Sequence, residues 1–191
     1  PDHNPFIHIP AGFSKTLADP KITWQFKSDP EPGIADRSIV YAQGKTLGGS
    51  SAINGMIYNR GQAADFDGWA QAGNTGWSYD EVLPYFRRTE NRIGESVDPN
   101  YRGVDGRLTV TTTQWPNELE TAFYDAAINA GYPHNDDYNG VSQEGVGSYQ
   151  SSISNGWRVS SASAFLKPAR RQYKVEVRCN ALAMSVILED K

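Results

Sequence analysis

The sequence predicts a mixed α/β fold (α+β mixed), because three kinds of local pattern occur side by side in its 191 residues. Residues 78–81 and 117–120 carry the polar start signals of helices. Residues 22–27 and 108–113 alternate in polarity or are rich in β-branched side chains, which is typical of strands. Between them, residues 44–61 form a glycine-rich stretch that no regular element explains. Helices and strands are therefore expected within one chain.

Composition excludes several classes of protein. Hydrophobic residues make up 38% and charged residues 21%, and no apolar run is long enough to cross a bilayer. The formal net charge of −4 argues against broad binding to nucleic acid or to anionic membranes. Cys179 is the single cysteine, so neither an internal disulfide nor a thiolate metal cluster is expected. The expected location is cytoplasmic, with association at the periphery of the inner membrane left open.

The N-terminal part is expected to form a hairpin that leads into the glycine-rich stretch. Residues 22–27 predict a half-buried strand with Trp24 and Phe26 on one face. Residues 29–33 carry turn residues, and residues 37–43 predict a second extended segment. After the glycines, residues 55–73 indicate a transition from loop to helix.

Two helices are predicted with defined ends. In residues 79–90, the Ser78 hydroxyl is placed to accept from the Glu81 amide while the Glu81 carboxylate reaches back, and Pro84 should bend the helix. The second begins at Asn117 and ends before Gly131. Its expected apolar face consists of Leu119, Phe123, Ala126 and Ala127.

The remaining segments are predicted as follows. Residues 91–106 are polar and indicate a surface loop, and residues 135–137 indicate a solvated turn without a third ligand for a metal. The later elements expected are strand 144–153, helix 158–169, and strands 175–178 and 183–188. His3, His8 and His134 have no acid–base partner that the sequence identifies, so no catalytic role is assigned to them.

The stretch 44–61 is the candidate binding feature. Glycine lets the backbone adopt positive φ and approach a ligand closely, and amides beside small hydroxyls can donate to an anion or to the edge of a heterocycle. Three simpler motifs fail on these residues. A P-loop requires glycine where Ile39 stands, and a hydrolase nucleophile elbow requires glycine where Ala52 stands. The dinucleotide fingerprint G-x-G-x-x-G occurs nowhere in the chain.

Taken whole, this string resembles the first signature of the glucose–methanol–choline (GMC) flavin oxidoreductases. The matching positions are Gly44, Lys45, Leu47, Gly48, Gly49, Ser50, Ser51, Ile53, Asn54, Tyr58, Gly61 and Asp67. Further blocks resemble the bacterial alcohol and choline dehydrogenase branch in the same order, namely 66–69, 76–86, 143–147, 155–156 and 158–166. The resemblance covers essentially the whole chain. It implies a middle segment of a longer polypeptide, without the preceding Rossmann fingerprint or the later catalytic histidine and its His/Asn partner.

The resemblance implies an FAD site. Part of a GMC-type FAD-binding domain is expected at 1–106, part of an antiparallel-sheet substrate domain at 107–157, and a return toward the FAD-binding domain at 158–191. The residues expected to line the FAD pyrophosphate and isoalloxazine are Gly48, Gly49, Ser50, Asn54, Gly55, Met56 and Ile57, and Ala183 is expected to offer backbone to the adenine end. Some members bind FAD covalently through a histidine where Ile53 stands here, so FAD is expected to be non-covalent.

The activity that the resemblance implies is oxidation of an alcohol CH–OH group, with hydride transfer from the substrate carbon to flavin N5. The expected partners are a small-molecule alcohol and the remainder of the polypeptide. No catalytic residue is expected in this segment, which alone should not turn over. The alternative considered is a non-catalytic carbohydrate-binding module, suggested by 12% aromatic residues, in which the stretch 44–61 has no role. The particular alcohol, the choice between oxidase and dehydrogenase, and the oligomeric state are left open.

Overall fold

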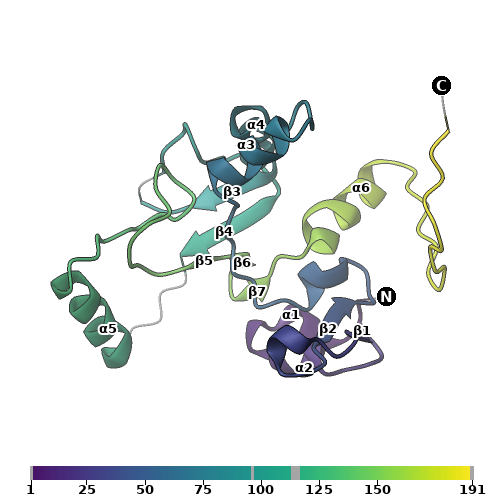
Figure 1. Cartoon of the computed structure of the whole chain (residues 1–191). Helices are drawn as coiled ribbons and strands as arrows, with labels where there is room; N and C mark the ends of the chain where they lie inside the picture. The colour runs from purple at the N-terminus through teal and green to yellow at the C-terminus, as the bar shows by residue number, and fades with distance from the viewer. Residues whose placement is uncertain (1, 96, 113–116, 190–191) are drawn as a thin grey trace.

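A computed structural model describes residues 2–95, 97–112 and 117–189 and confirms the mixed class, with helices and small sheets along the chain (Figure 1). The α-helices are α1 (Pro5–His8), α2 (Phe13–Leu17), α3 (Ala63–Gln71), α4 (Tyr79–Thr89), α5 (Glu118–Asn129) and α6 (Lys167–Gln172). The strands are β1 (Thr23–Lys27), β2 (Val40–Gly44), β3 (Glu90–Ile93), β4 (Leu108–Thr112), β5 (Gln150–Ser151), β6 (Ile153–Ser154) and β7 (Trp157–Arg158). Short 3₁₀ turns are η1 (Pro10–Gly12), η2 (Pro32–Ile34) and η3 (Gly49–Ala52), and η4 (Ala162–Leu166) is a π-helix.

The N-terminal part packs two short helices against the predicted hairpin. β1 and β2 pair antiparallel, from Thr23 opposite Gly44 to Lys27 opposite Val40, as the sequence predicted. The small hydrophobic core beneath them consists of Ile7, Ile22, Ala52 and Ile53, with Leu17 against it. The half-buried strand predicted at 22–27 is buried at Thr23 and open toward its other end, where Phe26 is 54% exposed.

Helices α1 and α2 were not anticipated, because each is at most five residues long and lacks a repeating apolar pattern. A cap starts α1: the Asn4 side chain accepts from the Phe6 amide at 3.0 Å, and Pro5 follows at the first helical position. Their position matters for the site. Ile7 of α1 packs in the core with Ala52 and Ile53 of the glycine-rich stretch, and its carbonyl accepts a hydrogen bond from Arg158.

Helices α3 and α4 pack through one aromatic residue. The ring of Phe66 on α3 contacts Tyr79 and Phe86 of α4 with centroids 6.2 and 5.6 Å apart. The capping box predicted at the start of α4 forms: Glu81 Oε2 accepts from the Ser78 amide at 3.1 Å and from its hydroxyl at 2.6 Å. Pro84 lies inside the helix, as expected. This local prediction is confirmed because both partners lie within one turn.

The central sheet has the order β3-β4-β5, with β3 parallel to β4 and β4 antiparallel to β5. The predicted surface loop 91–106 is therefore wrong in part, because β3 belongs to this sheet and both Arg92 and Arg102 are buried. The sheet takes strands from both sides of residue 106. The division into 1–106, 107–157 and 158–191 stays a prediction.

Helix α5 begins and ends where the sequence predicted. The Asn117 side chain accepts from the Leu119 amide at 2.9 Å, and Gly131 has φ of 96° just after the helix. The apolar face of α5 is largely open, with Leu119 79% exposed. Figure 1 shows α5 extending away from the sheet, so this face packs on little of the described chain.

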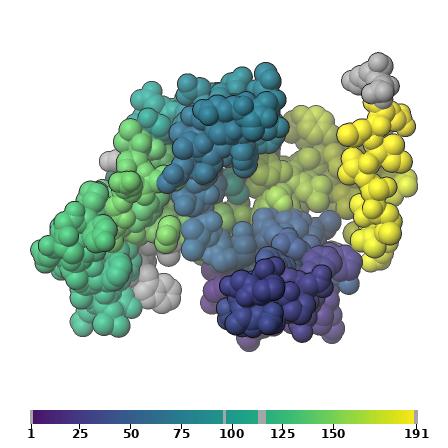
Figure 2. All heavy atoms as spheres, in the orientation of Figure 1, coloured from purple at the N-terminus to yellow at the C-terminus, as the bar shows by residue number. Residues whose placement is uncertain are grey.

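Predictions for the C-terminal third are only partly confirmed. The strand predicted at 144–153 is limited to β5 and part of β6, and the predicted helix 158–169 starts later because Arg158 pairs in β7. Residues 175–178 and 183–188 form no strand. A strand requires a neighbour for its amides and carbonyls, and these residues meet no strand among the described residues. Figure 2 shows this segment standing apart from the body of the molecule.

The described arrangement is open. Its accessible surface is 13,638 Å², whereas a compact monomer of 21.1 kDa would expose about 9,000 Å². Large apolar side chains are exposed on β2, α5 and the C-terminal segment. Within the described ranges, no helix combines the length and apolarity needed to cross a bilayer.

Replacing the cap of α4 tests the local energetics. Ser78→Ala removes the hydroxyl that bonds Glu81, so the free energy of unfolding should fall by about 1 kcal/mol. Thermal or urea unfolding followed by circular dichroism measures the change. Ser185→Ala, in the exposed C-terminal segment, is the matched control and should leave stability unchanged. Equal stability of both variants would contradict the assigned role of Ser78.

Candidate functional site

The glycine-rich stretch turns sharply after β2 and forms η3. Gly48 and Gly49 have φ of 91° and 55°, which are conformations that side chains rarely adopt. A Cβ on Gly44 would lie 2.1 Å from the carbonyl carbon of Gly49, so the end of β2 packs directly on this turn. Glycine is therefore required at these positions by backbone conformation and by close backbone packing.

Hydroxyl groups hold the turn together. Ser50 Oγ accepts from the Gly44 amide at 3.1 Å and donates to Gln43 Oε1 at 2.8 Å. Ser51 Oγ donates to the Gly48 carbonyl at 2.6 Å and accepts from the Ser161 amide at 2.9 Å. Ser161 thus connects the turn to the segment before the π-helix η4. Ser50 is one of the predicted cofactor residues, and in this structure its hydroxyl makes hydrogen bonds to Gln43 and Gly44 of the hairpin.

The next four residues, 53–56, are buried at both ends and exposed in the middle. Ile53 is buried in the core, whereas Asn54 and Gly55 are exposed. Asn54 Oδ1 accepts from the Met56 amide at 3.1 Å, and the side chain of Met56 is buried although its φ is 64°. This asparagine turn stabilises a backbone conformation that is unusual for methionine.

Ile57 faces outward from a bridge to β5. Its neighbours make the hydrogen bonds: Tyr58 N donates to the Gln150 carbonyl and Ser152 N donates to the Met56 carbonyl, both at 2.9 Å. Ile57 and Ser151 therefore form a non-hydrogen-bonded antiparallel pair, in which the amide and carbonyl of Ile57 point away from β5. Its side chain is 57% exposed. The segment 54–57 therefore presents an open edge of backbone and side chains on a fixed support.

The structure brings seven of the eight predicted site residues together. Those seven lie on one continuous loop, at Gly48, Gly49, Ser50, Asn54, Gly55, Met56 and Ile57. Ala183 lies in the exposed C-terminal segment that Figure 1 draws beyond α6, so it is not assembled with them here. The roles of all eight in cofactor binding stay predictions.

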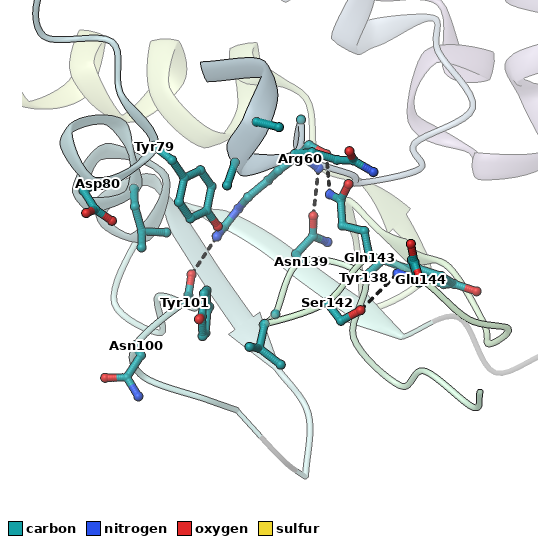
Figure 3. Close-up of a pocket in the computed structure, with 17 residues that line it drawn as sticks. Arg60, Tyr79, Asp80, Asn100, Tyr101, Tyr138, Asn139, Ser142, Gln143 and Glu144 are labelled. Carbon is teal, nitrogen blue, oxygen red and sulfur yellow. Dashed lines mark hydrogen bonds between the residues drawn. The ribbon is translucent and has the colours of Figure 1, made fainter. Parts of the chain in front are cut away.

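A separate cavity of about 600 Å³ lies beyond the end of this loop (Figure 3). Its wall is formed by three tyrosines and several amides from α4 and the loops around residues 100 and 140, including Tyr79, Tyr101, Tyr138, Asn100, Asn139 and Gln143. Arg60 forms one side of it. None of the predicted cofactor residues lines this cavity.

Behind the cavity lies a buried network of charges centred on Glu90. Its side chain accepts from Arg60 Nη2 at 2.6 Å and from Arg102 Nε at 3.1 Å, and a second bond joins Arg102 Nη2 to the other carboxylate oxygen. Burial opposes the charge of Arg102, but bonds and charge from Glu90, with the charge of Asp137, outweigh it and raise the guanidinium pKa. Burial next to Glu90 also raises the pKa of the Tyr58 phenol.

The network continues across the chain. Arg102 Nη1 donates to Asp137 Oδ1 at 2.5 Å and to Gln150 Oε1 at 2.7 Å. Asn139 accepts from the Arg60 amide at 2.8 Å and donates to the Tyr58 carbonyl at 3.1 Å. Two arginines are thereby balanced by two carboxylates. The expected solvated turn at 135–137 is wrong for Asp137, because its carboxylate is committed to Arg102. Within the described ranges, no three possible ligands gather for a metal.

Sequence reasoning missed this network. Glu90, Arg102 and Asp137 lie in segments interpreted as a helix end, a surface loop and a turn. Their partners lie 12 to 48 residues away along the chain, so no local spacing marks them. The network affects the site by fixing the position of two residues. Arg60 and Tyr58 are held on the central sheet, which fixes the end of the glycine-rich stretch.

The comparison with protein families identifies the chain. The model of the GMC oxidoreductase family matches residues 11–191. The chain belongs to the GMC oxidoreductase family. Among curated relatives, the oxygen-dependent choline dehydrogenase of Brucella ovis is 46% identical over 191 residues, and that of Rhizobium etli is 42% identical over 189 residues. These alignments cover 100% and 99% of this chain but 34% of each relative. The chain thus spans about a third of the length of these relatives.

Solved structures agree with this GMC assignment. Pyridoxine 4-oxidase from Mesorbium loti superposes with a TM-score of 0.82 at 30% identity, covering 90% of this chain and 33% of that one. An FAD-dependent oxidoreductase from Chaetomium thermophilum superposes with a TM-score of 0.77 at 27% identity, covering 88% and 31%. The family and class predicted from the sequence are therefore confirmed.

Removing the central carboxylate of the network should be costly. Glu90→Ala removes the carboxylate that pairs with buried Arg60 and leaves Arg102 with Asp137 alone, and it should lower the free energy of unfolding by about 3 kcal/mol or more. Chemical denaturation provides the measurement. The control is Glu176→Ala, which removes the exposed pair with Arg178 and should change stability by less than about 1 kcal/mol. Similar losses for the two variants would show that Glu90 does not organise this region.

Proposed function

We propose that this GMC oxidoreductase chain is the cofactor-holding part of an FAD-dependent enzyme that oxidises alcohols of the choline and simple-alcohol type. Membership of the family and similarity to the Brucella ovis choline dehydrogenase support the reaction class. Bound FAD would supply the acceptor for hydride from the alcohol carbon. The chain contributes no catalytic base to this proposal, and a histidine elsewhere in the polypeptide is proposed for that role.

The observation that carries the proposal is the open edge formed by residues 48–57. A Cβ built on Gly49 or Gly55 would meet no atom within 4 Å, so space lies directly beside the backbone at both glycines. Asn54, next to Gly55, is exposed, and beyond Gly55 the backbone groups of Ile57 point away from β5. These features fit a flat heterocycle with a phosphate tail, because backbone and amide groups can donate along an extended ligand.

In this proposal each part of the loop has a distinct role. The turn Gly48–Gly49 allows close approach of a phosphate, and the segment 54–57 forms a rigid wall for the flavin ring. Backbone at Ala183 is proposed for the adenine end. The core around Ile53, the bridge to Ser151 and the serine contacts orient the wall before any ligand arrives. Such preorganisation reduces the ordering that binding would otherwise require.

FAD is proposed to bind without a covalent link through this loop. The position at which some GMC proteins use histidine is Ile53, whose side chain has no nucleophilic atom and is 1% exposed. Packed against Ile7 and Ile22, it faces the core rather than the open edge. Neither its chemistry nor its position suits attachment to a flavin.

The remainder of the polypeptide is proposed as the main partner of this chain. The excess exposed surface and the open apolar face of α5 are consistent with a large interface to further sequence. The substrate alcohol would bind between the flavin wall and residues outside this chain. The carbohydrate-binding module is not favoured, because it explains neither the family match nor the loop. Cytoplasmic location and segment position stay predictions.

Flavin reduction by alcohol tests the proposal directly. The protein in its natural full length should be yellow as purified, and choline or a simple primary alcohol should bleach the flavin band under anaerobic conditions. Absorbance spectra record both properties. A compound of similar size without a hydroxyl group is a suitable negative control. A colourless protein that gains no flavin band with added FAD would refute the proposed cofactor.

Attachment of the cofactor is tested by denaturation. Because Ile53 cannot bond to flavin, acid precipitation of the coloured protein should leave free FAD in the supernatant. Separation of pellet and supernatant followed by flavin fluorescence measures the fraction released. Essentially complete release is expected, whereas flavin retained in the washed pellet would contradict non-covalent binding.

A further inference from the structure

Arg158 lies at a junction of three segments beside the proposed flavin wall. Its side chain is only 4% exposed. Nε donates to the Ile7 carbonyl at 2.7 Å, and Nη1 donates to the Ser51 carbonyl at 3.2 Å and to Asn54 Oδ1 at 2.7 Å. One arginine therefore connects α1, η3 and the exposed side chain of Asn54.

This arginine carries its charge in the interior without an acidic partner among the described residues. Each of its three bonds goes to a neutral carbonyl oxygen, and its Nη2 is buried with no hydrogen-bond partner within the ranges described. A buried cation of this kind is costly for stability. Burial accordingly lowers the pKa of the guanidinium. A contribution to the stability of the fold therefore does not explain why an arginine occupies this position.

The contact with Asn54 fixes the orientation of its amide. A guanidinium has only donors, so the atom that faces Nη1 must be the carbonyl oxygen of Asn54. The Met56 amide donates to the same oxygen from the other side. Both bonds hold Oδ1 inward, and the Nδ2 amino group must then project toward the exposed side of the residue. Asn54 is thereby limited to donating hydrogen bonds outward.

We propose that Arg158 is a positioning residue that holds Asn54 as an outward hydrogen-bond donor to the flavin. It acts through Asn54, and it does not itself touch the ligand. The inference rests on the proposed function, because it assumes that a flavin lies along residues 48–57. An acceptor-rich edge of the ring system is the chemical partner that two outward N–H groups recognise.

Two substitutions separate positioning from folding. Asn54→Asp keeps an oxygen for Arg158 and for Met56 but removes both outward donors, so the fold should persist while the flavin dissociation constant rises about tenfold or more. Arg158→Met removes the bonds that orient the amide. The flavin dissociation constant of the folded protein should therefore rise about tenfold. Both effects are measured by flavin titration of the natural full-length protein, with unfolding recorded in parallel.

The matched control is Arg92→Met. Arg92 is 7% exposed, bonds backbone carbonyls and Thr112, and likewise has a buried nitrogen, Nε, without a partner. It lies in the central sheet, and its hydrogen bonds go to Ile93, Val110 and Thr112. Arg92→Met likewise replaces a buried, incompletely paired guanidinium, but should leave the flavin dissociation constant of the folded protein unchanged.

The decisive experiment is a double-mutant cycle. In the Asn54→Asp background, Arg158→Met should change flavin affinity by much less than its tenfold effect in the wild type, because the oriented donors are already lost. Visible circular dichroism of bound flavin should change for Arg158→Met and not for Arg92→Met. Independent, multiplicative effects of the two substitutions would overturn the inference, as would wild-type affinity in Asn54→Asp. Failure of the wild-type protein to bind flavin would instead refute the proposed function itself.

Discussion

The arrangement depends on a buried carboxylate that serves two guanidinium groups. Glu90 is inaccessible to solvent and ends α4 at the point where the chain enters the central sheet. Through Arg60 it reaches the end of the glycine-rich stretch, and through Arg102 it reaches Asp137 and β5. The buried hydrophobic cluster of Ile7, Ile22, Ala52 and Ile53 lies in the N-terminal part, whereas the region around Glu90 is held by buried ion pairs. Such a network tolerates little change, because loss of one member leaves another buried charge unpaired.

The loop that holds the proposed cofactor site is fixed at its two ends by different kinds of interaction. Its first half is tied by aliphatic packing of Ile53 and by serine hydroxyls. Its second half is tied by the bridge of Ile57 to Ser151 and by the charged network below Arg60. Between these anchors, the exposed residues need no side-chain packing of their own. This division explains how a chain segment can be open on one face and still have one conformation.

Local signals in the sequence were reliable where both partners lie within a few residues. The capping residues Ser78 and Asn117 and the terminating Gly131 were predicted for this reason, and the glycines at 48 and 49 were recognisable from the family string. The charged network was not predictable, because polar residues in glycine-containing segments normally lie in solvent and no spacing connects Glu90 to Asp137. At residues 175–178 and 183–188, by contrast, strands were predicted and none forms. Their composition favours strands, but strand pairing depends on a neighbour that no local pattern supplies.

The bond from Arg158 to the Ile7 carbonyl spans 151 residues of sequence. During synthesis on a ribosome, the loop around Asn54 emerges long before the arginine that orients its amide. The hairpin and the first helices can form early, but the proposed flavin wall can gain its bonds to Arg158 only after residue 158 has left the exit tunnel. Nascent chains that stop short of this residue lack the bond to the Asn54 amide, so the proposed capture of flavin would come late in biogenesis.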